Sequence, residues 1–69
     1  MRKIVKIAKV CEGFYKVMFE IGSQKCFCRY DSDNDEITCL IRGGKQYTAK
    51  SVLANYNDLK EMIRSEINK

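Results

Sequence analysis

Apolar and polar residues alternate with a period of two over the first part of this chain, as in strands with one buried face. The clearest alternation covers residues 14–21, ends at Gly22-Ser23, and resumes over residues 24–30. A two-residue loop that begins with glycine is typical of a tight hairpin, because glycine accepts a positive φ. We therefore predict a hairpin in which paired residue numbers sum to 45.

This register assigns each side chain of the hairpin to one face, because directly opposed residues share a face. One face is apolar and is predicted to form the core: Tyr15, Val17, Phe19, Ile21, Cys26, Cys28 and Tyr30. The other face mixes basic, aromatic and apolar side chains: Phe14, Lys16, Met18, Glu20, Lys25, Phe27 and Arg29. A slip of one residue would exchange the two faces, so the pattern specifies the register strongly.

An acidic turn follows, and then a further strand over residues 36–42. A turn centred on Asp33-Asn34 predicts that paired residue numbers in this second hairpin sum to 67. Three residues of the strand then join the core face, Ile37, Cys39 and Ile41. Two others join the opposite face, Leu40 and Arg42. The Gly43-Gly44 pair ends the strand, with a short extension predicted after it.

Residues 2–10 are rich in β-branched side chains and are predicted as the first strand, but two registers remain open. A three-residue turn with Gly13 in the left-handed region turns Val5 and Ile7 to the core. A two-residue turn instead buries a different set, which includes a lysine in mid-strand: Ile4, Lys6, Ala8 and Val10. We favour the first register because lysine is rarely buried.

The last third of the chain has helical periodicity. Apolar residues recur at spacings of four, three, four and four: Val52, Tyr56, Leu59, Ile63 and Ile67. Polar or small residues fall opposite: Ala54, Asn57, Asp58, Glu61, Arg64 and Ser65. We favour one continuous helix with Thr48 as its N-cap. The alternative is a start near Asn57, where Asp58-x-x-Glu61 resembles a capping box, preceded by a looser turn.

These elements predict the α+β class: a four-stranded antiparallel meander with one C-terminal helix packed on one face, forming a single domain over residues 1–69. A chain of this size buries roughly 60% of its unfolded surface, so its stability is expected to be small. It contains no apolar run of the ~20 residues that a membrane span needs. Charged residues interrupt the apolar ones from Arg2 to Lys6, so we expect no signal peptide and a cytoplasmic location.

Four cysteines raise the question of a metal site. The predicted registers turn Cys26, Cys28 and Cys39 into the apolar core and leave Cys11 beyond the far end of the hairpin ladder. Buried cysteine packs as a small hydrophobe, and the chain has no histidine. We therefore expect no metal. Cys28 and Cys39 are predicted cross-strand neighbours, but a disulfide is not expected in a reducing compartment.

No motif predicts catalysis or a cofactor. Asp31-x-Asp33-x-Asp35 begins like a calcium loop but lacks the later glycine and glutamate, so it is interpreted as a hairpin turn. The segment 42–45 lacks the Gly-Lys-Ser/Thr element of a phosphate loop. Without histidine, and with no evident base to activate a serine or cysteine, the chain is interpreted as a non-enzyme with no cofactor.

The sheet face opposite the helix is the predicted binding surface. Its expected members interleave rings, cations and aliphatic groups: Phe14, Lys16, Met18, Lys25, Phe27, Arg29, Leu40 and Arg42. Exposed apolar patches of this kind mark interfaces. We expect a protein partner or a homodimer, by analogy with the small inhibitors and adaptors that phages encode.

Two other interpretations of this surface remain open, and no membrane partner is expected under any of them. One is a site for single-stranded DNA or RNA, with cations on phosphates and rings on bases. This fits a net charge of +4. The other is an ordinary solvated sheet face.

Overall fold

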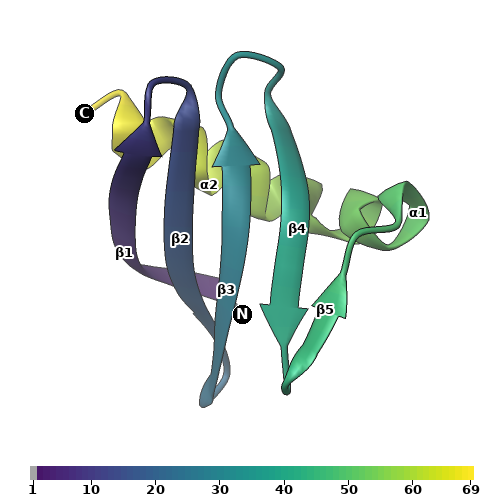
Figure 1. The fold of residues 1–69 in the computed structure, drawn as a ribbon. Helices are drawn as coiled ribbons and strands as arrows, with labels where there is room; N and C mark the ends of the chain where they lie inside the picture. Colours follow the sequence, from purple (N-terminus) through teal and green to yellow (C-terminus); the bar gives the residue numbers. More distant parts are fainter. Residues whose placement is uncertain (1) are drawn as a thin grey trace.

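The computed structural model describes residues 2–69 as one antiparallel sheet with a helix packed on one of its faces (Figure 1). The strands follow each other in chain order: β1 (Arg2–Cys11), β2 (Phe14–Ile21), β3 (Gln24–Asp31), β4 (Glu36–Arg42) and β5 (Lys45–Tyr47). The helical elements follow: α1 (Lys50–Leu53), the 3-10 turn η1 (Ala54–Tyr56) and α2 (Asn57–Ile67). The predicted α+β class and meander are confirmed, with five strands where four were expected.

The fifth strand is the short extension expected after the Gly43-Gly44 turn. Both glycines have positive φ angles of 59° and 77°, which L side chains rarely adopt, and the turn folds β5 back along the end of β4. Only the last three residues of β4 are paired with β5. The edge of β4 is therefore covered near Arg42 and open near Glu36.

The β2–β3 hairpin has the predicted register along its whole length. Tyr15 lies opposite Tyr30, Val17 opposite Cys28, and Phe19 opposite Cys26, with Gly22 at a positive φ of 62° in the turn. The predicted core face is buried or half-buried throughout. The glycine turn fixes the register here, as the sequence pattern indicated.

The β3–β4 hairpin keeps its predicted register only beside the turn. Tyr30 lies opposite Ile37, as expected, but Arg29 lies opposite Cys39, so Thr38 is an extra residue in β4. Beyond this bulge every side chain of β4 lies on the face opposite to the one predicted. The placement of Leu40 on the outer side was wrong, since it is fully buried opposite Cys28.

The same shift corrects three further placements. Arg42 belongs to the helix side of the sheet, where it contacts Tyr56. Cys39 and Ile41, predicted for the core, lie on the outer side, and Ile41 is 41% exposed. Cys28 and Cys39 therefore point to opposite faces of the sheet and are not the cross-strand neighbours that the sequence predicted.

Two register shifts divide β1, so neither predicted register holds along its full length. The turn is the two-residue one, with Cys11 opposite Phe14, whereas Ile7 lies opposite Val17 as the favoured register predicted. A second shift places Ile4 opposite Phe19, so Ile4 takes the core position expected for Val5. Val5 is left 48% exposed. Figure 1 shows the resulting bend of β1, whose first residues curve behind β2 toward the helices.

The C-terminal segment is not one continuous helix. It breaks at η1, and α2 begins at Asn57, as in the alternative prediction. Thr48 is not the N-cap, because α1 begins at Lys50 and follows Ala49, which makes no side-chain capping bond. No helix within residues 2–69 is long and apolar enough to cross a membrane.

The core lies between α2 and the sheet. It joins five predicted strand residues and Leu40, which was not predicted for the core, with the apolar side of the helical segment: Val17, Phe19, Cys26, Cys28, Tyr30, Leu40, Leu53, Tyr56, Leu59 and Ile63. The polar side predicted for the helical segment is exposed. Figure 1 shows α2 running across the strands on one side, which leaves the other side of the sheet uncovered in this chain.

Candidate binding face

The side chains on the sheet side opposite α2 form a surface that we term the outer face. The pairing registers assign these residues to it: Lys3, Lys6, Ala8, Cys11, Phe14, Lys16, Met18, Glu20, Lys25, Phe27, Arg29, Asp31, Glu36, Cys39, Ile41 and Gln46. Six of the eight residues predicted for this surface lie there. Leu40 and Arg42 do not. Lys6 and Ile41, which the sequence did not place there, are added.

An apolar row crosses the middle of the outer face. Met18 lies opposite Phe27, and Phe27 lies opposite Ile41, so three neighbouring strands each contribute one apolar side chain. Lys6 and Gln46 continue the row onto the two edge strands. None of the three apolar side chains is fully buried. Met18 and Phe27 are half-buried and Ile41 is exposed, so the row is a partly exposed apolar band at right angles to the strands.

Cations border this band on both sides. One border lies two residues along the strands from Met18 and Phe27, where Lys16 is opposite Arg29. The other border lies two residues away in the opposite direction, where Lys25 is opposite Glu20. Glu20 also faces Lys3, at the bent end of β1. The Lys16 ammonium lies 5.9 Å from the centroid of the Phe27 ring, a distance at which a cation is attracted to the ring face.

The outer face carries half of the net charge of the chain. Its charged side chains are five cations and three carboxylates, Glu20, Asp31 and Glu36, so its net charge is +2 of the +4 of the whole sequence. The remaining eight cations and six carboxylates give the other +2. Among residues 2–69, no ion pair involves any of the five outer-face cations. These cations are available to an external partner.

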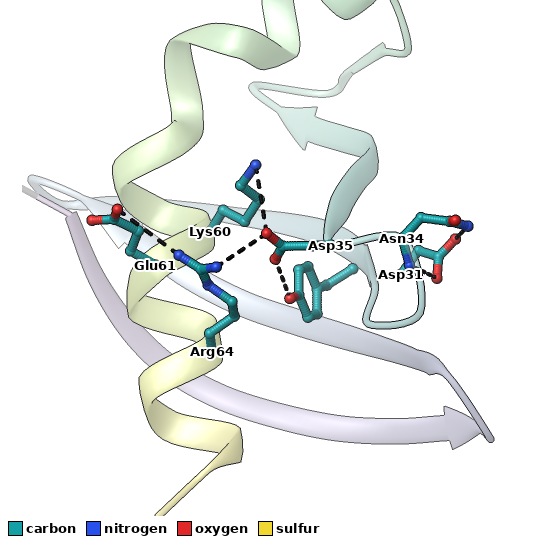
Figure 2. A network of polar contacts seen from close by, with 7 residues as sticks. Asp31, Asn34, Asp35, Lys60, Glu61 and Arg64 are labelled. Carbon is teal, nitrogen blue, oxygen red and sulfur yellow. Dashed lines mark hydrogen bonds and ion pairs between the residues drawn. The ribbon is translucent and has the colours of Figure 1, made fainter.

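The acidic β3–β4 turn uses its carboxylates within the fold, as Figure 2 shows. Asp31 accepts hydrogen bonds from the backbone N–H groups of Asp33 and Asn34 and from the Asn34 side-chain amide. The Asn34 amide is the main reason that the pKa of Asp31 is lowered. The carboxylate thus stabilises the turn, a pattern common for aspartate at this position.

Asp35 joins the same turn to α2 and to the core. Its carboxylate accepts a 2.6 Å hydrogen bond from the Tyr30 hydroxyl and lies 3.1 Å from the Arg64 guanidinium and 3.9 Å from the Lys60 ammonium. Figure 2 shows the side chain pointing at both cations. Burial, together with this hydrogen bond, raises the pKa of Tyr30 to about 12. The three aspartates that resemble a calcium loop therefore belong to a turn in which Asp31 and Asp35 bind groups of the chain itself.

The four cysteines differ in access. Cys26 and Cys28 lie in the core, and burial raises the pKa of the Cys28 thiol to about 12. Cys39 lies on the outer face, where its sulfur accepts a 3.3 Å hydrogen bond from the Gln46 amide, and Cys11 is exposed. Within residues 2–69, no cluster of three cysteine, aspartate or glutamate side chains could hold a metal ion.

Tyr56 joins β1 and β4 to the helical segment. The Arg2 guanidinium lies over its ring, 4.5 Å from the centroid, and also pairs with Asp58. Arg42 donates a 3.2 Å hydrogen bond to the Tyr56 hydroxyl, which raises the pKa of the guanidinium, and a 3.1 Å bond to Gln24. Arg42, a predicted binding residue, is thus occupied by internal contacts.

A groove lies elsewhere, between the open part of β4 and the helical segment. Its volume is about 340 Å³, and Ile37, Leu53 and Lys60 are among its lining residues. Its lining includes three charged residues, Glu36, Lys50 and Lys60, but neither a serine nor a cysteine. The outer face therefore remains the candidate functional site.

Comparison of the chain with protein-family models, with curated proteins and with solved structures gave no match.

Proposed function

We propose that this protein is a non-enzymatic binding module that engages a protein partner through the outer face. The observation that carries the proposal is the partly exposed apolar row of Met18, Phe27 and Ile41, bordered by cations that form no ion pair within residues 2–69. An apolar centre with a charged border is the usual anatomy of a protein–protein interface.

The core gives no independent reason for an apolar row on this side of the sheet. Val17, Phe19 and Leu40 already fill the helix side and are fully buried, whereas Ile41 keeps 41% of its surface exposed. Exposing aliphatic groups gains nothing for folding. A partner that covers the row would gain the free energy of burying it. In this proposal a small inhibitor or adaptor role in the cytoplasm fits the size of the module.

Face-to-face pairing of two copies is disfavoured by charge. The outer face has five cations against three carboxylates, a net charge of +2, and an isologous dimer would bring two such faces together. Like charges at an interface cost several kcal/mol. The proposed partner is therefore a different protein.

A second candidate function is binding of single-stranded DNA or RNA. The arrangement of Phe27 beside Lys16 and Arg29 favours it, because a ring can stack on a base while cations contact phosphates. The aliphatic members of the row, Met18 and Ile41, have no role in base stacking. The protein partner is favoured for this reason.

Affinity capture from the source cells, with and without nuclease, separates the two functions. A protein partner should remain bound after nuclease treatment, and its purified complex should lose affinity only moderately with salt. Nucleic-acid binding should instead fall steeply with salt through counterion release. Capture that nuclease abolishes would reject the protein-partner proposal in favour of the second candidate.

A further inference from the structure

We propose that the partner presents an amphipathic α-helix whose apolar stripe is bordered by carboxylates, and that this helix lies across the strands along the apolar row. This inference rests on the proposed function of the outer face and adds the shape and charge of what binds there. Three observations support this inference: the spacing of the two cationic borders, the length of the row between them and the charges of the borders.

The spacing of the cationic borders matches the width of a helix. On β2, Lys16 lies two residues to one side of Met18 and Glu20 two residues to the other, and on β3 Arg29 and Lys25 flank Phe27 in the same way. Four residues along a strand span about 13 Å. An α-helix with side chains is about 10–12 Å wide. A helix seated on the apolar row would therefore place its two flanks beside the two borders.

The length of the row fits several helical turns. With its polar end members the row crosses all five strands, from Lys6 on β1 through the apolar centre of Met18, Phe27 and Ile41 to Gln46 on β5. Strands lie about 4.8 Å apart, so the row is about 19 Å long. At 1.5 Å per residue, that length accommodates about 13 helical residues. An extended strand laid along the row would be only about 5 Å wide and would not reach both borders.

The charges set the composition of the helix flanks. The border of Lys16 and Arg29 holds two cations and no carboxylate, whereas the border of Lys3 and Lys25 includes Glu20. Both borders are net positive, and the first is the stronger. A helix with carboxylates on both flanks would complement them, with more carboxylates beside Lys16 and Arg29. Complementary charges of this kind increase the association rate and fix the orientation of the partner.

The helix cannot come from a second copy of the structured chain. The apolar side of α2 is already used, since Leu59 and Ile63 are fully buried in the core of their own chain. The exposed side of α2 mixes both signs, with Arg64 next to Glu61. Another copy could offer such a helix only by unfolding, so the occupant is a different acidic protein.

Synthetic peptides of about 18 residues test the proposal directly, with fluorescence anisotropy for affinity and amide chemical shifts for location. The probe peptide carries a leucine stripe of helical period bordered by glutamate. One control peptide has lysine in place of glutamate. A second control has the probe's composition rearranged so that leucine and glutamate alternate. A fifteen-nucleotide oligo-thymidine represents the nucleic-acid alternative.

We expect the probe peptide to bind at least about tenfold more tightly than either control peptide or the oligonucleotide. Shifts should concentrate at the amides of Met18, Phe27 and Ile41, and peptide circular dichroism should show a gain in helix. Changing Lys16→Gln and Arg29→Gln should weaken the probe about tenfold. The matched change Lys45→Gln and Lys50→Gln removes the same charge elsewhere and should alter affinity less than about twofold.

The remaining outcomes overturn the proposal in distinguishable ways. If the alternating peptide binds the outer face as well as the probe, or if neither peptide binds, the helical partner is rejected and the face itself stays a candidate. If the oligonucleotide binds this face more tightly than the probe, the second candidate function replaces the first. If the shifts fall outside the outer face, both the helical partner and the proposed function fail.

Discussion

At the scale of single residues, two aspartates of one turn show how neighbouring carboxylates take different roles. Asp31 is buried and holds the turn by accepting three N–H groups, whereas Asp35 reaches Tyr30 and the cations of α2. Asp35 also has a positive φ of 53°, a conformation that aspartate tolerates better than most residues. Neither carboxylate is free to bind an external ligand without breaking these contacts.

The lowered pKa of Asp31 predicts how stability depends on pH. Because its folded pKa lies below the unfolded value, its contribution is present above about pH 4 and is lost as the pH falls through the folded pKa. Asp31→Asn keeps an acceptor oxygen but does not titrate. The stability difference between wild type and Asp31→Asn, measured by denaturant unfolding, should therefore shrink from pH 5 toward pH 2. A difference that stays constant over this range would contradict the role given to Asp31.

The positions of the four thiols predict an order of chemical labelling. In the native protein an alkylating reagent at pH 8 should modify exposed Cys11 first and half-buried Cys39 more slowly. Cys26 and Cys28 should react only after unfolding, because both are in the core and the Cys28 thiol, with a pKa of about 12, stays protonated. Mass spectrometry of digested protein checks the order. Early modification of Cys28 would show that the sheet register is wrong.

At the scale of elements, the turns at one end of the sheet support each other. The Gly13 carbonyl accepts a 2.9 Å hydrogen bond from the Ser32 backbone, which joins the β1–β2 turn to the β3–β4 turn. Gly13 is buried and has a φ of 83°. A Cβ at this position would lie 2.5 Å from a carboxylate oxygen of Asp33, whereas a Cβ at Gly22 would meet nothing within 4 Å.

Gly13→Ala should therefore destabilise the protein more than Gly22→Ala. Both changes place an L residue at a positive φ, which costs about 1–2 kcal/mol. Only Gly13→Ala adds the clash with Asp33. Adding Asp33→Ala should remove the extra loss, so that the double variant unfolds at nearly the same denaturant concentration as Gly22→Ala. Equal losses for the two single variants would contradict the close approach of the two turns.

Contacts between the sheet and α2 predict a second stability effect. Phe19 and Ile63 are fully buried on opposite sides of the same core. Truncation of either to alanine should cost on the order of 3 kcal/mol through lost burial and cavity formation. Exposed Ser65 on the same helix provides the control, and Ser65→Ala should change stability by less than about 0.5 kcal/mol. Chemical denaturation measures the stability of all three variants. If Phe19→Ala is nearly as stable as the wild type, Phe19 is not part of the core.

The sequence predicts the elements that glycine turns control and fails where a strand contains an extra residue. The β2–β3 hairpin is correct because Gly22 fixes its register and the alternation is strict. In β4, Cys39, Leu40 and Ile41 are consecutive apolar residues, so the pattern fits either face equally well. The bulge at Thr38 decides between them, and it has no side-chain signature. Compared with the predicted site, the observed outer face therefore lacks Leu40 and includes Ile41.

A similar ambiguity explains β1 and the helix. Ile4 and Val5 are adjacent and both apolar, so sequence periodicity cannot show which of them faces the core. The break at η1 falls on Ala54-Asn55-Tyr56, where the amphipathic spacing continues although the backbone tightens. Packing of Leu53 and Tyr56 into the core decides the geometry there. Tertiary contacts override local helix preference at such places.

At the scale of the whole molecule, the main feature is a division between two sides of one sheet. The helix side holds the core. The outer face has a net charge of +2 and an apolar row that no other part of residues 2–69 covers. This division could be predicted in outline from the hairpin pattern. Only the folded structure shows which cations form ion pairs within the fold and which do not.

The most direct test of this account is the affinity of the captured partner for a double variant of the outer face. Phe27 and Arg29 lie next to each other on β3, outside the core. Phe27→Ser with Arg29→Gln should abolish binding and leave the melting temperature within a few degrees of wild type. The control Lys45→Gln with Lys50→Gln should bind normally. If the Phe27/Arg29 variant binds the partner as tightly as wild type, the interface lies elsewhere and the outer face is only a solvated sheet surface.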